Sequence, residues 1–174
     1  MTSSILNEIN KRSKLQSLNL DQNRLQKFPE VVTQLSYLRQ LHLDNNQIRL
    51  PATIKNLIEL EQLWLGGNLL WQLPIELGQL TSLTELHLGK NIVHQLPSEL
   101  GNLKRLVSLN PGHNHLTKIP SQILDLRQLE TLNLEGNVRS NIVTDFGKLL
   151  TSRVRLEVAL EQADVAQERS EVLR

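Results

Sequence analysis

The 174-residue sequence contains no cysteine, one methionine and only 3% aromatic residues. Without cysteine, the chain can form no disulfide bond, no thiolate zinc site and no cysteine nucleophile. An excess of one charge is also lacking, because 19 lysines and arginines nearly balance 18 aspartates and glutamates. The net charge of +1 therefore gives no reason to expect binding to nucleic acid or to an anionic membrane.

Long apolar runs are absent as well. No segment approaches the roughly 18 consecutive apolar residues that a membrane-spanning helix needs. Residues 1–16 contain no continuous apolar stretch of the kind found in a secretory signal peptide. We therefore expect a soluble, cytoplasmic protein. Apolar residues still make up 39% of the chain, mostly leucine, isoleucine and valine, which is enough for the core of one domain.

Leucine recurs along the chain with a spacing of 22 or 23 residues. The pattern Leu-x-x-Leu-x-Leu-x-x-Asn starts six times, at Leu15, Leu38, Leu60, Leu83, Leu106 and Leu129. Its asparagines are Asn23, Asn46, Asn68, Asn91, Asn114 and Asn137. In the first five units an apolar–proline pair follows, with further apolar residues three and six positions after the proline. One such unit cannot bury its leucines alone, so neighbouring units must stack on one another.

Each part of the unit predicts a local structure. The Leu-x-Leu alternation predicts a short strand whose leucines point to one side. Return of the same residues in every unit favours a parallel sheet with strands about 4.8 Å apart. The apolar spacing of three suits a 3₁₀ segment on the opposite side. The asparagine amide both donates and accepts, so we interpret it as a partner for backbone groups where the strand leaves the sheet.

These recurring positions resemble the leucine-rich repeat family in its 23-residue form, LxxLxLxxNxLxxLPxxIxxLxx. That form is typical of intracellular members such as Ras-group repeat proteins, Scribble-type scaffolds and the repeat regions of Roco GTPases. The resemblance implies an α/β solenoid, a right-handed superhelix with a short parallel β-sheet on its concave face and helical caps at both ends. We expect a single domain with an N-terminal helical cap (1–14), six repeats (15–151) and a C-terminal cap helix (152–174).

Two of the first five repeats depart from the pattern. The second is one residue short, since "NQIRLP" replaces the longer "NRLQKFP", and we expect one tighter loop. In the fifth, Pro111 stands where the other repeats have an inward-facing leucine. One interpretation is a tolerated defect that costs about 1 kcal/mol for the lost ladder bond and about 1–3 kcal/mol for unfilled volume. The other is a bulge that bends the sheet and re-aims Asn110, Gly112 and His113.

Outward-facing strand residues are free of any role in the core, and Trp64 stands out among them. Exposed tryptophans are enriched among the residues that dominate protein interfaces. We predict that a partner protein or peptide binds the concave face, in signalling or scaffolding. The predicted contact residues are Gln40, His42, Asp44, Gln62, Trp64, Glu85, His87, Lys90 and Asn110. Two histidines in this set predict an affinity that varies between about pH 5.5 and 7.5. Trp71 either extends this patch or packs on its neighbours.

We expect no enzymatic activity, no cofactor and no bound metal. His42 and His87 belong to strands about 9.6 Å apart, too far to share one ion. The chain lacks a phosphate-binding G-x-x-x-x-G-K-[ST] motif, and no serine or cysteine shares a predicted pocket with a histidine and an acid.

An alternative function is a structural or assembly role for the C-terminal segment. Val158, Val165 and Val172 recur every seven residues in a segment rich in helix formers. They belong either to a solvated surface helix or to a contact with a partner helix. A homodimer through residues 154–172 is the weaker expectation beside a monomer.

Overall fold

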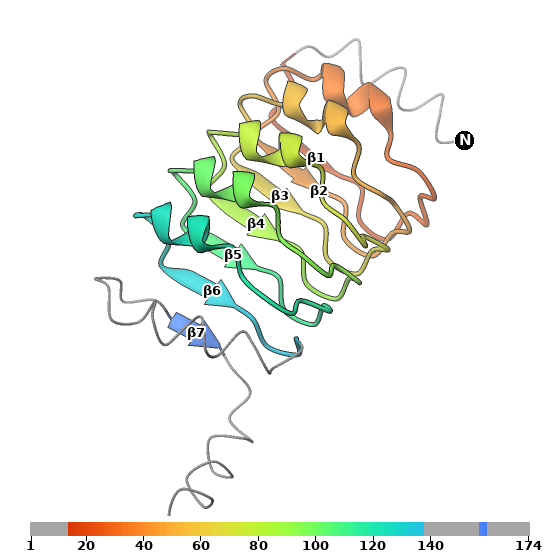
Figure 1. Cartoon of the computed structure of the whole chain (residues 1–174). Helices are drawn as coiled ribbons and strands as arrows, with labels where there is room; N and C mark the ends of the chain where they lie inside the picture. The colour runs from red at the N-terminus through yellow and green to blue at the C-terminus, as the bar shows by residue number, and fades with distance from the viewer. Residues whose placement is uncertain (1–13, 138–156, 160–174) are drawn as a thin grey trace, which may run out of the picture.

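The computed structural model describes residues 14–137 and 157–159. Each repeat contributes one three-residue strand and, in the first five, one short 3₁₀ helix (Figure 1). The repeat strands are β1 Ser17–Asn19, β2 Gln40–His42, β3 Gln62–Trp64, β4 Glu85–His87, β5 Ser108–Asn110 and β6 Thr131–Asn133. The 3₁₀ helices are η1 Glu30–Gln34, η2 Ala52–Asn56, η3 Ile75–Gln79, η4 Ser98–Asn102 and η5 Ser121–Asp125.

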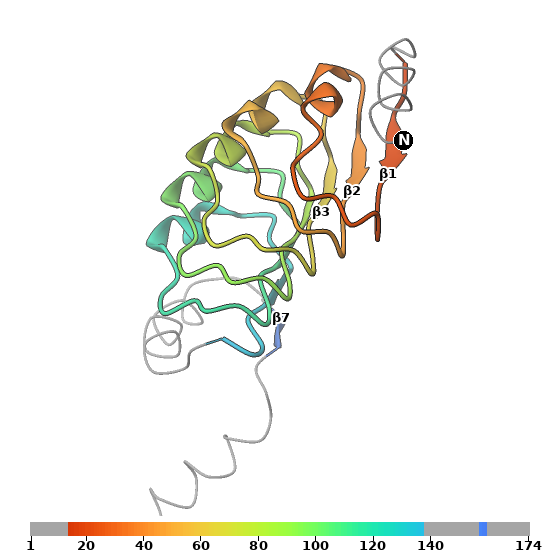
Figure 2. The same ribbon diagram turned by 90° about the vertical axis from the view of Figure 1, so that its right-hand side faces the viewer.

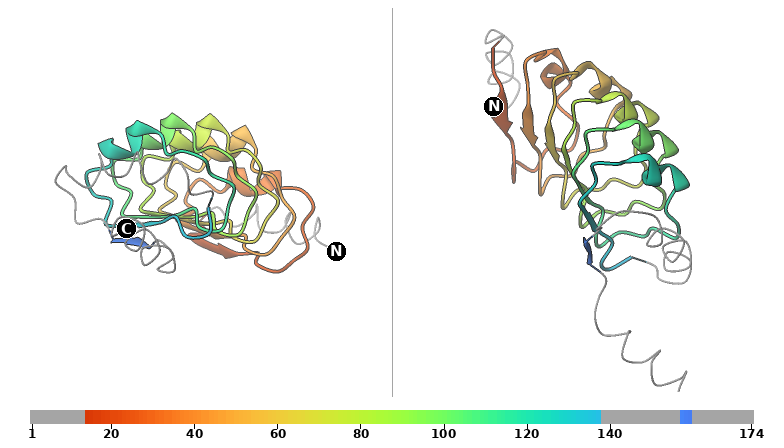
Figure 3. Two further views of the ribbon diagram at one scale, coloured as in Figure 1. Left: turned by 60° about the horizontal axis from the view of Figure 1, so that its bottom comes forward. Right: turned by 90° about the vertical axis from the view of Figure 1, so that its left-hand side faces the viewer.

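The strands form one parallel sheet in chain order. Equivalent residues of successive repeats pair directly, so that Leu41 lies beside Leu63 and Leu63 beside Leu86. The strands line the inner side of the curved molecule and the 3₁₀ helices its outer side (Figures 2 and 3). The solenoid, its parallel sheet and its 3₁₀ return segments are thus confirmed.

Beyond the six repeat strands, a seventh strand, β7 Glu157–Ala159, pairs with β6 in parallel and places Val158 opposite Leu132. The prediction of a helix over 152–174 was therefore wrong for these three residues. Pairing with β6 supplies hydrogen-bond partners to an edge strand that otherwise has none on that side. The rest of that predicted helix, the proposed dimer segment 154–172 apart from β7, and the N-terminal cap before residue 14 lie outside the described residues.

Leucine rows fill the space between the sheet and the 3₁₀ helices. Leu41, Leu63 and Leu86 of the central strands are each fully buried, and so are Ile54, Leu77 and Leu100 from the 3₁₀ helices. Burying one such side chain stabilises the fold by about 1.5–3 kcal/mol, so these rows are the main favourable contribution. A proline precedes every 3₁₀ helix, where its fixed φ suits the entry and its missing N–H costs no bond.

The buried asparagines form a continuous ladder between repeats. Asn91 donates from Nδ2 to the carbonyls of Leu65 and Leu88, both at 2.9 Å, and its Oδ1 accepts the N–H of Leu70 at 3.0 Å. The same bonds recur at the equivalent asparagines, Asn46, Asn68, Asn114 and Asn137. The structural role inferred from the sequence is confirmed at these five asparagines, because each amide joins the backbones of two neighbouring repeats. Asn23, in the first repeat, instead donates from Nδ2 to the Asp21 carbonyl of its own repeat at 2.9 Å.

Pro111 is buried in the inward row, as expected. Because proline has no backbone N–H, Pro111 cannot form the strand bond that its equivalent Leu88 forms, at 2.7 Å, to the Asn110 carbonyl of the next strand. Paired residues of β5 and β6 accordingly end at Leu109 and Leu132, one pair short of the other repeat strands. The ladder resumes where His113 donates to the Glu135 carbonyl. Register is retained across the gap, which favours a tolerated defect over a bulge.

Candidate functional site

Three stacked rings occupy the middle of the concave face. Each comes from the last position of its strand, and pairing places His42 beside Trp64 and Trp64 beside His87. The His42 and Trp64 ring centroids lie 3.9 Å apart with planes 5° apart, and those of Trp64 and His87 lie 5.3 Å apart with planes 2° apart. The indole is partly exposed, and because both its faces are covered it offers its edge to a ligand. It also fills the space between the two imidazoles in which a shared metal ion would have to sit.

A row of hydrogen-bonded side chains runs beside the stack, two residues earlier on each strand. Gln40 donates from Nε2 to Oε1 of Gln62, and Gln62 donates in the same way to Oε1 of Glu85, both at 2.8 Å. The other carboxylate oxygen of Glu85 lies 3.4 Å from Nε2 of His87 and so joins this row to the stack. These contacts hold the long side chains in one arrangement before any partner arrives, which lowers the conformational entropy that binding would cost.

On the other side of the stack lies a shallow hollow of about 260 Å³. Trp64 and His87 border it, and Asp44, Lys90 and Asn110 also line it. Gly66, Gly89 and Gly112 contribute bare backbone to its lining, because repeats three to five carry glycine where other repeats carry a side chain. The Asn110 side chain is fixed here, since its Oδ1 accepts the N–H of Gly112 at 3.1 Å.

Asp44 is the one described group in this region with a shifted pKa. Its Oδ1 accepts the backbone N–H of Gly66 at 2.6 Å, and its side chain is partly buried. Burial raises the pKa of Asp44, and the carboxylate of Asp21 raises it further, while the Gly66 hydrogen bond and the two nearby histidines oppose the change. The ionised carboxylate is therefore less favourable in the folded chain than in the unfolded chain.

This raised pKa predicts that Asp44→Asn stabilises the protein at neutral pH. A carboxyl whose folded pKa is raised contributes stability at low pH and loses it as the pH rises through that pKa. Asparagine keeps an oxygen for the Gly66 N–H but never ionises. Urea denaturation at several pH values should show that the advantage of the variant over wild type grows from about pH 3 to pH 7. An advantage that is independent of pH would contradict this explanation.

All nine residues predicted for the site lie on one continuous surface made of the ring stack, the hydrogen-bonded row and the hollow. The structure adds Asn45, His113 and Asn133 to the lining of the hollow. Trp71, left open by the sequence, is 51% exposed and lies away from this surface, on a loop after β3. Within the described residues, no group of three or more histidines, aspartates or glutamates is placed to hold a metal ion, and no helix is long and apolar enough to cross a membrane.

Comparison with known proteins identifies the repeat. The family model described as Leucine Rich Repeat matches residues 14–35 and 37–57. A leucine-rich repeat protein of Leptospira interrogans superimposes on the chain with a TM-score of 0.81 and 38% sequence identity over 87% of this chain. The chain is a leucine-rich repeat protein. No curated protein matches its sequence significantly.

Other leucine-rich repeat structures are similar over most of the chain. An internalin of Listeria monocytogenes shares 26% identity over 88% of this chain, with a TM-score of 0.72. The ectodomain of the Arabidopsis thaliana receptor kinase GASSHO1/SCHENGEN3 was solved in complex with CASPARIAN STRIP INTEGRITY FACTOR 2. It shares 26% sequence identity over 75% of this chain, with a TM-score of 0.57. This leucine-rich repeat chain spans 38%, 45% and 19% of the Leptospira, Listeria and Arabidopsis chains, less than half of each.

Proposed function

We propose that this leucine-rich repeat chain is a non-enzymatic module that binds a partner protein or peptide on its concave face, centred on Trp64. The observation that carries the proposal is the stack of His42, Trp64 and His87 beside a hydrogen-bonded polar row. None of these side chains belongs to the leucine core, so the fold does not require them. A rigid aromatic group set among ordered polar groups is the composition that protein interfaces favour.

The relatives support this class of function. The Arabidopsis ectodomain similar to this chain was solved in complex with CASPARIAN STRIP INTEGRITY FACTOR 2, and the matching family model describes a repeat rather than an enzyme. A cytoplasmic location and a role in signalling or scaffolding stay predictions from the sequence, since the similar structures include a receptor ectodomain. Assembly through the C-terminal segment also stays a prediction, because most of that segment lies outside the described residues.

Replacing Trp64 with alanine tests the proposal. In an affinity pull-down from native lysate, proteins retained by wild type should be lost from the Trp64→Ala variant, and calorimetry with the captured partner should show a loss of about 2 kcal/mol or more, roughly thirty-fold in affinity. Tyr37→Ala is the matched control, because Tyr37 is an aromatic residue 55% exposed outside the sheet. Partners that bind Trp64→Ala as tightly as wild type would remove the concave face from the function.

A further inference from the structure

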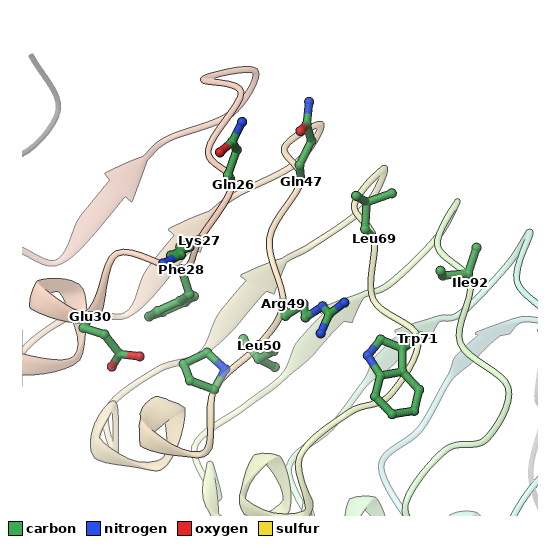
Figure 4. Close-up of a pocket in the computed structure, with 11 residues that line it drawn as sticks. Gln26, Lys27, Phe28, Glu30, Gln47, Arg49, Leu50, Leu69, Trp71 and Ile92 are labelled. Carbon is green, nitrogen blue, oxygen red and sulfur yellow. The ribbon is translucent and has the colours of Figure 1, made fainter.

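A second surface lies on the loops that connect each strand to the following 3₁₀ helix. Here a groove of about 830 Å³ opens across repeats one to four, over the shortened loop of repeat two (Figure 4). We call it the loop groove, and the residues that matter to its chemistry are Lys27, Arg49, Leu69, Trp71 and Ile92. None of them belongs to the concave surface described above.

The apolar side of the loop groove is not required by the fold. Leu69 and Ile92, 52% and 39% exposed, each follow the ladder asparagine directly, where repeats one, two and five carry Arg24, Gln47 and His115. The same turn forms with those three polar residues, so the fold does not require an apolar side chain at Leu69 or Ile92.

Trp71 belongs to the same apolar side. It stands two residues after Leu69, where repeat one has Gln26 and repeat five has Thr117, and it is 51% exposed. Large apolar side chains gathered at the surface of two adjacent repeats are typical of an interaction site.

The loop groove also carries basic side chains. Lys27 and Arg49 line it, and within the described parts of the chain neither forms an ion pair. The one acidic residue in the lining, Glu30, already accepts a hydrogen bond from Oγ1 of Thr53 at 2.7 Å. In Figure 4 the guanidinium of Arg49 points toward the indole of Trp71 on the neighbouring loop. The groove therefore combines two cations that have no ion-pair partner among the described residues with an apolar patch in the same lining.

We propose that the loop groove binds an extended, acidic peptide segment of another protein, in which an apolar anchor residue lies close to an aspartate or glutamate. The anchor packs on Leu69, Trp71 and Ile92, and the carboxylate pairs with Arg49 and Lys27. Such a carboxylate gives Arg49 the planar, two-pronged partner that its guanidinium geometry favours. This site is separate from the concave face, so the protein can hold two segments at once.

The test is selection of peptides from a random ten-residue phage-displayed library on the full chain. Selected peptides should pair an apolar residue with Asp or Glu, and their synthetic copies should bind Trp71→Ala and Arg49→Glu at least ten-fold more weakly by fluorescence polarisation. Two matched controls should bind as wild type does. Trp64→Ala removes the other tryptophan, and Lys118→Glu reverses a charge on the equivalent loop of repeat five.

Peptides that lack acidic residues, or that bind all variants equally, would overturn the proposal. So would peptides weakened only by Trp64→Ala, which would place them on the concave face and leave the proposed function standing. Analytical ultracentrifugation of the full chain tests the remaining alternative, in which a second copy of the chain occupies the groove. A dimer that Trp71→Ala dissolves would mean that a second copy of the chain covers the groove, and the peptide assignment would be wrong.

Discussion

Asn91→Ala should lower the free energy of unfolding by about 3–5 kcal/mol, because one small side chain satisfies several buried backbone groups at once. Its amide donates to the carbonyls of Leu65 and Leu88 and accepts the N–H of Leu70, and Asn91 is only 5% exposed. Alanine would leave these backbone groups without partners, away from water. Asn91→Asp should be at least as damaging at neutral pH, since a carboxylate accepts but cannot donate to the two carbonyls.

Urea denaturation of Asn91→Ala beside Asn102→Ala measures this effect. Asn102 is an exposed residue at the end of η4, so its loss should change the stability by less than about 0.5 kcal/mol. The difference in the free energy of unfolding between the two variants gives the contribution of the ladder bonds, because both variants lose an asparagine side chain. Equal stabilities would mean that the asparagine ladder adds nothing to the stability that the leucine rows and the sheet provide.

Pro111→Leu should act in the opposite direction and raise the stability by about 1–3 kcal/mol. Leucine restores an N–H that can donate to the next strand, as Leu88 does to Asn110, and it fills the inward row with the side chain that the other repeats use. The Asn114 and Asn137 bonds to the carbonyl of residue 111 do not depend on its side chain. The melting temperature should rise accordingly in a thermal unfolding scan.

The reverse exchange, Leu88→Pro, serves as the matched control in the preceding repeat. It removes the bond to the Asn110 carbonyl and empties a fully buried position, so it should lower the melting temperature. If Pro111→Leu instead lowered it, the proline would have a specific structural role, and the tolerated-defect interpretation would be wrong.

The repeating positions made the fold predictable from the sequence. Six-fold recurrence of the Leu-x-Leu pair and of the asparagine amide fixes strand, return segment and stacking together, because no other arrangement buries every leucine row. The same alternation places Trp64 on the concave face without any knowledge of the structure. The sequence indicates the loop groove only weakly, because Leu69 and Trp71 are apolar where other repeats are polar. The structure showed that both side chains are exposed, which indicates a binding surface.

Details set by side-chain torsions and by the end of the array were not predictable in this way. Periodicity places His42, Trp64 and His87 in one row but does not say that their rings stack, since that depends on side-chain rotamers. Residues 157–159 belong to a segment rich in helix formers, yet they form a strand. Local propensity is weak beside the gain from pairing with the open edge of β6.

Site-specific photo-cross-linking tests most directly whether the concave face is the binding surface. A benzophenone side chain introduced at Gln62, which lies on β3 two residues before Trp64, should cross-link to the captured partner. The same group at Ile58, exposed and outside the sheet, should not. Cross-linking at Ile58 alone, or with equal yield at both positions, would contradict binding centred on Trp64.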